Sequence, residues 1–266
     1  MREVLALVRA NWLTQTSYRL GTVFSMFSIL ISVIPLYFIS DALQPVMAES
    51  IRDEGGQYFG FLVIGMSATL LVTSAVNLLP SSVSSGISRG TLEAMVSTPT
   101  PLPVLLIGMI GFGIVWTFIR IVVIVAGGWI LGVPVQIGSL LPASVILLLT
   151  LLAYLPIGLI ASAMVVVFRT AGPLPQGAIY LSILLGGVYY PTNVIPDWIQ
   201  NLSDWVPLTY ALRALRRVIL EGAGLHTVIA DIGMVLLFVI VLFAIACLTF
   251  SLAYQYARRA GTLAQY

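Results

Sequence analysis

Long apolar segments alternate with short polar ones along the 266-residue chain. A helix rises about 1.5 Å per residue, so about 20 apolar residues cross the roughly 30 Å hydrocarbon layer of a bilayer. The pattern therefore predicts an all-α membrane protein. Five segments are long enough to predict membrane-spanning helices without help from their neighbours: residues 20–39, 58–79, 104–131, 139–168 and 227–254.

A sixth apolar segment, residues 177–190, is shorter than the other five. As a helix it measures about 21 Å, so it spans the bilayer only together with the residues that follow it. Those residues include Pro191 and Pro196, which break the helix within an apolar context. We expect six spans, with residues 191–225 forming a re-entrant helical hairpin before the last span.

Two further segments have amphipathic patterns. In the predicted hairpin, Trp198 and Trp205 lie on the apolar side of a first short helix, and residues 208–220 predict a second helix with arginines on one flank. Residues 1–19 place apolar side chains at helical spacing, with arginines away from them. Such patterns are typical of helices in the membrane interface. We therefore expect an N-terminal interfacial amphipathic helix on the cytoplasmic face.

The composition agrees with a membrane protein, because 59% of the residues are hydrophobic and only 8% are charged. A soluble domain carries about 25% charged residues. The sequence contains no lysine, and a P-loop needs a lysine for the nucleotide phosphates, so this chain is not a P-loop ATPase. Its single cysteine, Cys247, and single histidine, His226, lack the partners that a metal site would need.

The distribution of arginine predicts the orientation, because cytoplasmic loops carry an excess of positive charge. With six spans and a cytoplasmic N-terminus, most arginines lie inside and most acidic residues outside, so both termini are expected in the cytoplasm. This topology places Arg213, Arg216 and Arg217 at the outer face, against the trend. A five-span topology would bring them inside, but it would place Arg258 and Arg259 outside.

The loop between the second and third spans, residues 81–103, predicts a short cytoplasmic helix over residues 87–96 that ends before a run of prolines. This loop and the segment before the last span resemble the type-2 ABC transporter permease family, similar to the drug-resistance and polysaccharide or lipid exporter permeases. The residues that carry the resemblance are Gly90-Thr91-Leu92-Glu93, Ser97-Thr98-Pro99, Tyr190-Pro191 and Pro207-Leu208-Thr209-Tyr210-Ala211-Leu212-Arg213.

The resemblance, which extends along nearly the whole chain, implies the permease subunit of an ATP-driven exporter in a bacterial inner membrane. Two permeases, as a homodimer or a heterodimer, would form the translocation path on two separate ATPase subunits. The chain would be no enzyme and would bind no cofactor and no nucleic acid, while the partner ATPase uses ATP and Mg. A coupling helix would contact that ATPase through Arg89, Gly90, Thr91, Leu92 and Glu93.

Charged and aromatic residues near or within the membrane are candidates for the substrate path or its exit. For Arg120, deep in the third span, we favour an ion pair with Asp231 over substrate contact, because a buried charge is costly. The outer arginines either hold anionic groups or extend to the interface, and the aromatic residues are expected to anchor there. The candidates are Arg120, Tyr189, Tyr190, Trp198, Trp205, Arg213, Arg216 and Arg217.

Two other classes of membrane protein remain as alternatives. An ion-coupled secondary transporter usually has acidic residues at mid-membrane and an internal repeat, and Asp231 alone is weak support for it. An intramembrane lipid-modifying enzyme would need a metal-binding aspartate cluster or a histidine centre. The sequence has neither a D-x-x-D nor an H-E-x-x-H arrangement. The transported substrate is left open.

Overall fold

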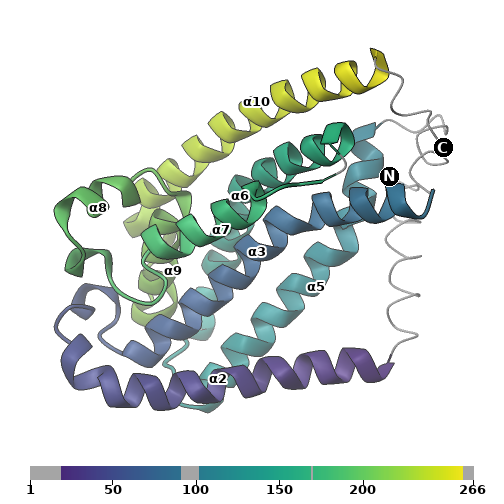
Figure 1. Cartoon of the computed structure of the whole chain (residues 1–266). Helices are drawn as coiled ribbons and strands as arrows, with labels where there is room; N and C mark the ends of the chain where they lie inside the picture. The colour runs from purple at the N-terminus through teal and green to yellow at the C-terminus, as the bar shows by residue number, and fades with distance from the viewer. Residues whose placement is uncertain (1–18, 91–101, 169, 260–266) are drawn as a thin grey trace.

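A computed structural model of the chain describes residues 19–90, 102–168 and 170–259 (Figure 1). The predicted interfacial helix therefore lies outside the described residues, apart from Arg19. Within these ranges the regular elements are helices and none is a strand, which confirms the all-α class. The α-helices are α2 (Arg19–Met47), α3 (Tyr58–Ser88), α5 (Leu102–Ile130), α6 (Leu140–Phe168), α7 (Leu174–Leu185), α8 (Asp197–Ser203), α9 (Pro207–Glu221) and α10 (Ile229–Arg259).

Five of these helices are long and apolar enough to cross a membrane, judged by length and composition: α2, α3, α5, α6 and α10. They correspond to the five long apolar segments, so those five predictions are confirmed as helices. Two helices run well beyond the predicted ends, because the backbone hydrogen bonds of a helix continue through polar residues. α2 continues past residue 39 to Met47, and α3 continues past residue 79 to Ser88.

The sixth predicted span corresponds to α7, which has 12 residues and a length of about 18 Å. Alone it is too short for a roughly 30 Å hydrocarbon layer. The helix ends before Pro191, the residue expected to break it, because Gly186 and Gly187 follow its last turn. Gly187 has a φ of 72°, a left-handed conformation that glycine adopts without steric cost. The six-span topology stays a prediction.

The positions of the first end of α2 and the last end of α10 favour an even number of crossings between them. The start of α2 and the end of α10 lie at the same end of the molecule, whereas α8 lies at the opposite end (Figure 1). Five long helices alone would leave these two ends on opposite sides. In the predicted six-span topology, α7 and the segment that follows it would supply the return path. We call the end that carries α8 and α9 the α8 end.

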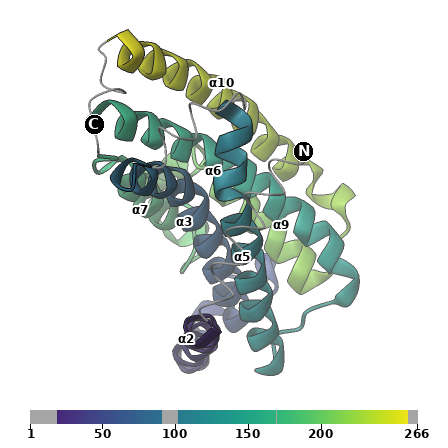
Figure 2. The same cartoon turned by 90° about the vertical axis from the view of Figure 1, so that its right-hand side faces the viewer.

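Helix α3 is the centre of the fold, and α2 and α10 lie at opposite edges of it (Figure 2). In the most apolar window of each helix, 72% of the α3 residues are buried, against 11% for α2 and 11% for α10. α3 packs against α2, α5, α6, α7 and α9. The exposed apolar faces of α2 and α10 are what a helix against lipid or against another membrane-embedded chain requires.

Close packing of α6 on α3 depends on Gly158 of α6. A Cβ atom at this position would lie 2.8 Å from the carbonyl oxygen of Ala75 and 3.0 Å from that of Val76, both on α3. Such distances to backbone atoms are shorter than van der Waals contact. The absence of a side chain at Gly158 therefore sets how closely α6 packs on α3.

Both helices of the predicted hairpin are present at the α8 end. α9 matches the predicted helix over residues 208–220 within one residue at each end. The side chain of Trp198, on α8, is 66% exposed, and that of Trp205, which follows α8, is 79% exposed. Such exposure is typical of aromatic residues that anchor in the membrane interface. Two turns, η1 (Arg52–Glu54) and η3 (Thr192–Val194), lie in the loops before α3 and before α8. Re-entry of this hairpin into the bilayer stays a prediction.

Candidate functional site

The guanidinium of Arg216 is buried within the α8 end of the molecule. The predicted topology instead places it at the outer membrane interface. Its side chain is 2% exposed, and its Nη1 atom lies 2.7 Å from a carboxylate oxygen of Glu54, which is 18% exposed. The expected exposure was wrong because α9 is covered on nearly all sides. Eleven residues of this 15-residue helix are buried, so part of its polar flank also faces the protein interior.

Two backbone carbonyls and an aromatic ring complete the surroundings of this guanidinium. Its Nη2 atom donates hydrogen bonds to the carbonyl oxygens of Gly187, at 2.9 Å, and Val188, at 3.3 Å. The guanidinium carbon lies 3.3 Å from the centre of the Phe61 ring, a cation–π contact. We call Arg216, Glu54, Phe61, Gly187 and Val188 the Arg216 cluster. It joins η1, α3 and α9 to the break after α7.

The charge of Arg216 is compensated within this cluster. Burial lowers the pKa of Arg216 to about 10, and the neighbouring Glu54 carboxylate opposes that shift. The guanidinium therefore stays protonated at neutral pH. Because its folded pKa lies below the usual value for arginine, this group makes folding less favourable at neutral pH, and that penalty fades as the pH rises through 10. A fully enclosed, paired arginine suits a structural role better than the binding of a diffusing anion.

Two further hydrogen bonds hold the segment after α7 against the loop between α2 and α3 and against the start of α3. The Tyr58 hydroxyl donates a hydrogen bond of 2.8 Å to the carbonyl oxygen of Tyr189. The Asn193 side chain donates one of 2.9 Å to the carbonyl oxygen of Ser50. The segment after α7 is thus fixed by hydrogen bonds to residues more than 100 positions away in the chain. If this segment moves, either these hydrogen bonds break or the loop between α2 and α3 moves with it.

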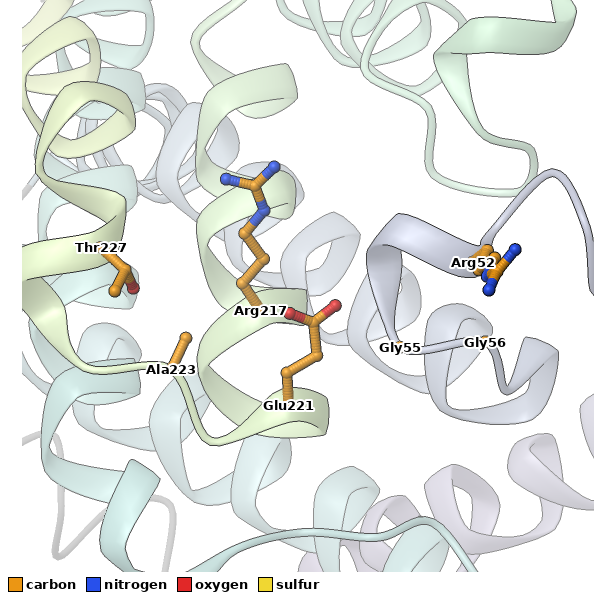
Figure 3. Close-up of a pocket in the computed structure, with 7 residues that line it drawn as sticks. All are labelled: Arg52, Gly55, Gly56, Arg217, Glu221, Ala223 and Thr227. Atoms are coloured by element: carbon orange, nitrogen blue, oxygen red, sulfur yellow. The ribbon is translucent and has the colours of Figure 1, made fainter.

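Arg213 and Arg217 occupy different environments from Arg216. Arg213 lies 3.5 Å from a carboxylate oxygen of Asp231, at the start of α10. The expected ion pair between Arg120 and Asp231 was therefore wrong, because the hairpin brings Arg213 to Asp231 instead. Arg217 lines a pocket of about 720 Å³ with Arg52 and Glu221. Figure 3 shows Arg217 and Glu221 on the same helix, with Arg52 across the opening.

Of the predicted aromatic residues, the two tyrosines lie beside the Arg216 cluster and the two tryptophans do not. Tyr189 accepts the bond from Tyr58 through its backbone, and its side chain is 49% exposed. The Tyr190 hydroxyl donates a hydrogen bond to the carbonyl oxygen of Leu184. Trp198 and Trp205 project from the surface. The eight candidates therefore do not form one site.

Glu54 is the functional candidate that sequence reasoning missed. It lies in a polar loop with several other acidic residues, and nothing in the local sequence distinguishes it from Glu49 or Asp41. The one signal is the following pair, Gly55-Gly56, since both adopt positive φ angles and mark a tight turn. Such a turn fixes the direction of the side chain before it.

The predicted coupling segment is described only in part. Arg89 caps the C-terminus of α3 and is exposed, and Gly90 follows with a φ of 67°. Thr91, Leu92 and Glu93 lie outside the described residues. The first residues of the short helix predicted over 87–96 belong to α3, which continues to Ser88. No group of three metal-binding side chains exists among the residues that the structure describes.

Comparison with known proteins identifies the family. The profile described as "ABC-2 type transporter" matches residues 2–220. The inner membrane transport permease YadH of Escherichia coli (strain K12) is 25% identical over 212 residues, which cover 79% of this chain and 81% of YadH. The linearmycin resistance permease protein LnrN of Bacillus subtilis (strain 168) is 26% identical over 202 residues, covering 72% of this chain and 48% of LnrN. The chain belongs to the ABC-2 type transporter family and is a membrane transport permease.

Proposed function

We propose that this chain is the permease subunit of an ATP-driven exporter and that a separate polypeptide supplies the ATPase. The family match over residues 2–220 carries the proposal, and the relatives are named as a transport permease and a resistance permease. The absence of lysine adds to it, because no P-loop can be built in this sequence. ATP and Mg then belong to the partner.

A dimer of permeases in a bacterial inner membrane is part of the same proposal. α2 and α10 leave broad apolar faces exposed along most of their length, more than the central helix α3 does. A lipid-facing helix and a helix at a permease interface have the same need for apolar surface. Whether the second copy is identical stays open. YadH, one of the relatives, is named as an inner membrane protein.

The coupling role belongs to the loop after α3, at the end of the molecule opposite α8. α3 extends nine residues beyond the apolar segment, with Ser81, Ser84, Ser85, Ser88 and Arg89 exposed. A polar helix end of this kind suits contact with a soluble subunit. In this proposal Arg89, Gly90, Thr91, Leu92 and Glu93 contact the ATPase, and both chain termini lie on that side.

The proposal is tested by separating the chain from the polypeptide that is expected to hydrolyse ATP. We expect the tagged chain, purified from native membranes in mild detergent, to carry a second polypeptide with a P-loop and to hydrolyse Mg-ATP. Stripped of that polypeptide in harsher detergent, the chain should retain its helical spectrum and hydrolyse no ATP. Substituting the P-loop lysine of the partner should abolish hydrolysis in the complex. Hydrolysis by the stripped chain, at a rate unaffected by that substitution, would falsify the proposal.

A further inference from the structure

A second pocket, with a single arginine in its lining, lies between α2, α3 and α5. Its volume is about 420 Å³, and none of the described residues that line it is acidic. Arg120 supplies its charge, three serines of α2 supply hydroxyl groups, and apolar side chains form the rest of the wall. The lining residues are Ser25, Ser28, Ile29, Ser32, Met66, Leu70, Arg120 and Ile124.

Arg120 lies near the middle of the membrane by its position in α5. It precedes the last residue of that helix, Ile130, by ten positions, or about 15 Å along the axis. This is half of a roughly 30 Å hydrocarbon layer, where an arginine is costly and usually functional. Residues Val104–Ile130 are otherwise apolar enough to span the membrane, so Arg120 is the exception within this span.

The charge of Arg120 has no counter-ion among the described residues. The two ion pairs present there join Arg213 to Asp231 and Arg216 to Glu54. The Nε atom of Arg120 is buried and has no hydrogen-bond partner in the described part of the chain. A buried donor without a partner is energetically unfavourable. The Nε atom of Arg216 is unpartnered in the same way, so what distinguishes Arg120 is that no carboxylate lies within 4 Å of it in the described part of the chain.

The serines of α2 place hydroxyl groups next to this cation. Ser25, Ser28 and Ser32 recur at intervals of three and four residues, so they share one face of the helix, and all three line the pocket. The Ser32 hydroxyl donates to the carbonyl oxygen of Ile29 at 2.6 Å. Within the described ranges, Ser25 and Ser28 form no side-chain hydrogen bond, so their hydroxyls are available to a ligand.

We propose that this pocket binds the anionic group of a transported amphiphile, and the inference rests on the exporter function proposed above. A guanidinium offers several donors in a fixed plane to a phosphate, sulfate or carboxylate, and serine hydroxyls add single donors. Ile29, Met66, Leu70 and Ile124 provide apolar wall for the adjoining part of the ligand. The substrate class is therefore an amphiphile with a negative charge.

A membrane phospholipid with an anionic headgroup offers the same chemistry and is the alternative source of the ligand. The two differ in their effect on the ATPase. A transported molecule that enters this pocket should stimulate ATP hydrolysis by the complex. A lipid held permanently should co-purify with the chain and leave the rate unchanged when more is added.

Binding of dodecyl phosphate to the chain in neutral maltoside detergent tests the site directly. We expect saturable binding that Arg120→Gln weakens about tenfold or more and that Arg120→Lys weakens less. Ser25→Ala with Ser28→Ala should weaken it further. The matched control is Arg52→Gln, which removes an exposed arginine at the α8 end and should change nothing. Equal affinity in the wild type and in a folded Arg120→Gln variant overturns the site.

Two further measurements, made on the complex with its ATPase, complete the test. Stimulation of hydrolysis by dodecyl phosphate that is lost in Arg120→Gln supports a transported anion. Co-purified anionic lipid that Arg120→Gln removes, with no stimulation in either variant, overturns the transport assignment and leaves a lipid site. Because binding is measured without ATP, a chain that binds dodecyl phosphate but associates with no ATPase would contradict the exporter proposal alone.

Discussion

At the scale of single residues, three arginines show that burial and pairing decide the role of a membrane cation. Arg216 is enclosed and has a carboxylate, two carbonyls and a ring around it. Arg213 is 38% exposed and pairs with Asp231 at 3.5 Å. Arg120 lines a pocket and has no carboxylate within 4 Å among the described residues. Of these three arginines, Arg120 alone lacks a carboxylate partner in the described part of the chain and can therefore pair with an anionic ligand.

The Arg216 cluster predicts a coupled effect on stability. Glu54→Gln removes the charge partner of a buried guanidinium, so we expect it to lower the free energy of unfolding by about 3 kcal/mol. In an Arg216→Met background the same change should cost much less, because no buried charge is left uncompensated. Thermal unfolding of the two single variants and the double variant in detergent measures this coupling.

Glu49→Gln is the matched control for that cycle. Glu49 lies in the same loop but is exposed, so its substitution should change stability by less than about 0.5 kcal/mol. If Glu54→Gln costs the same amount with Arg216 present or absent, the two residues are not energetically coupled, and the cluster does not hold the break after α7.

Which of these arginines pairs with which acid could not be predicted from the sequence. An ion pair depends on where two distant segments meet, and Glu54 and Arg216 are 162 positions apart. The cost of a buried charge favoured a partner for Arg120, but that cost gives no information on which face of a helix Arg120 or Asp231 occupies. The pairing of Asp231 follows instead from the fold of the hairpin.

At the scale of elements, apolar length predicted five long helices, while the sixth depended on local backbone chemistry. A run of apolar residues reports which side chains avoid water, but it does not report where the backbone turns. α7 stops at Leu185 because Gly187 adopts a left-handed conformation, and the apolar residues Val188 and Tyr189 continue beyond it. The helix therefore ends before residue 190, the predicted boundary of the sixth span.

The contact between α3 and α6 predicts opposite effects for two glycine substitutions. Gly158→Ala adds a methyl group against the carbonyl oxygens of Ala75 and Val76, so we expect it to lower stability by about 1–3 kcal/mol. Gly233→Ala, on α10, adds the same group in open space and should stabilise the helix by up to about 1 kcal/mol. The stabilities of the two variants are compared by their melting temperatures in the same detergent. A Gly158→Ala variant as stable as the wild type would show that α6 can move away from α3 without an energetic cost.

At the scale of the whole molecule, the fold places residues at opposite ends of the long helices, and the arginine distribution predicts which end faces the cytoplasm. α3 has 31 residues and is about 45 Å long, with Tyr58 at one end and Arg89 just past the other. The Tyr58 hydroxyl donates a hydrogen bond to Tyr189, in the segment that leads into α8. Helix α8, which includes Asn201, therefore lies at the end of the molecule opposite the end of α3 that leads to Arg89 (Figure 1).

This geometry predicts the pattern of cysteine labelling in intact cells. In a Cys247→Ala background, Asn201→Cys should react with a membrane-impermeant thiol reagent from outside, because Asn201 is exposed at the end that we assign to the outer face. Arg89→Cys should react only after the membrane is opened. Glu49→Cys, also exposed and in the loop after α2, should behave as Asn201→Cys does. The reverse pattern would keep the fold and invert the orientation, moving the proposed ATPase contact away from the loop after α3. Labelling of Asn201→Cys and Arg89→Cys from the same side would contradict the arrangement of α3 and α8 itself.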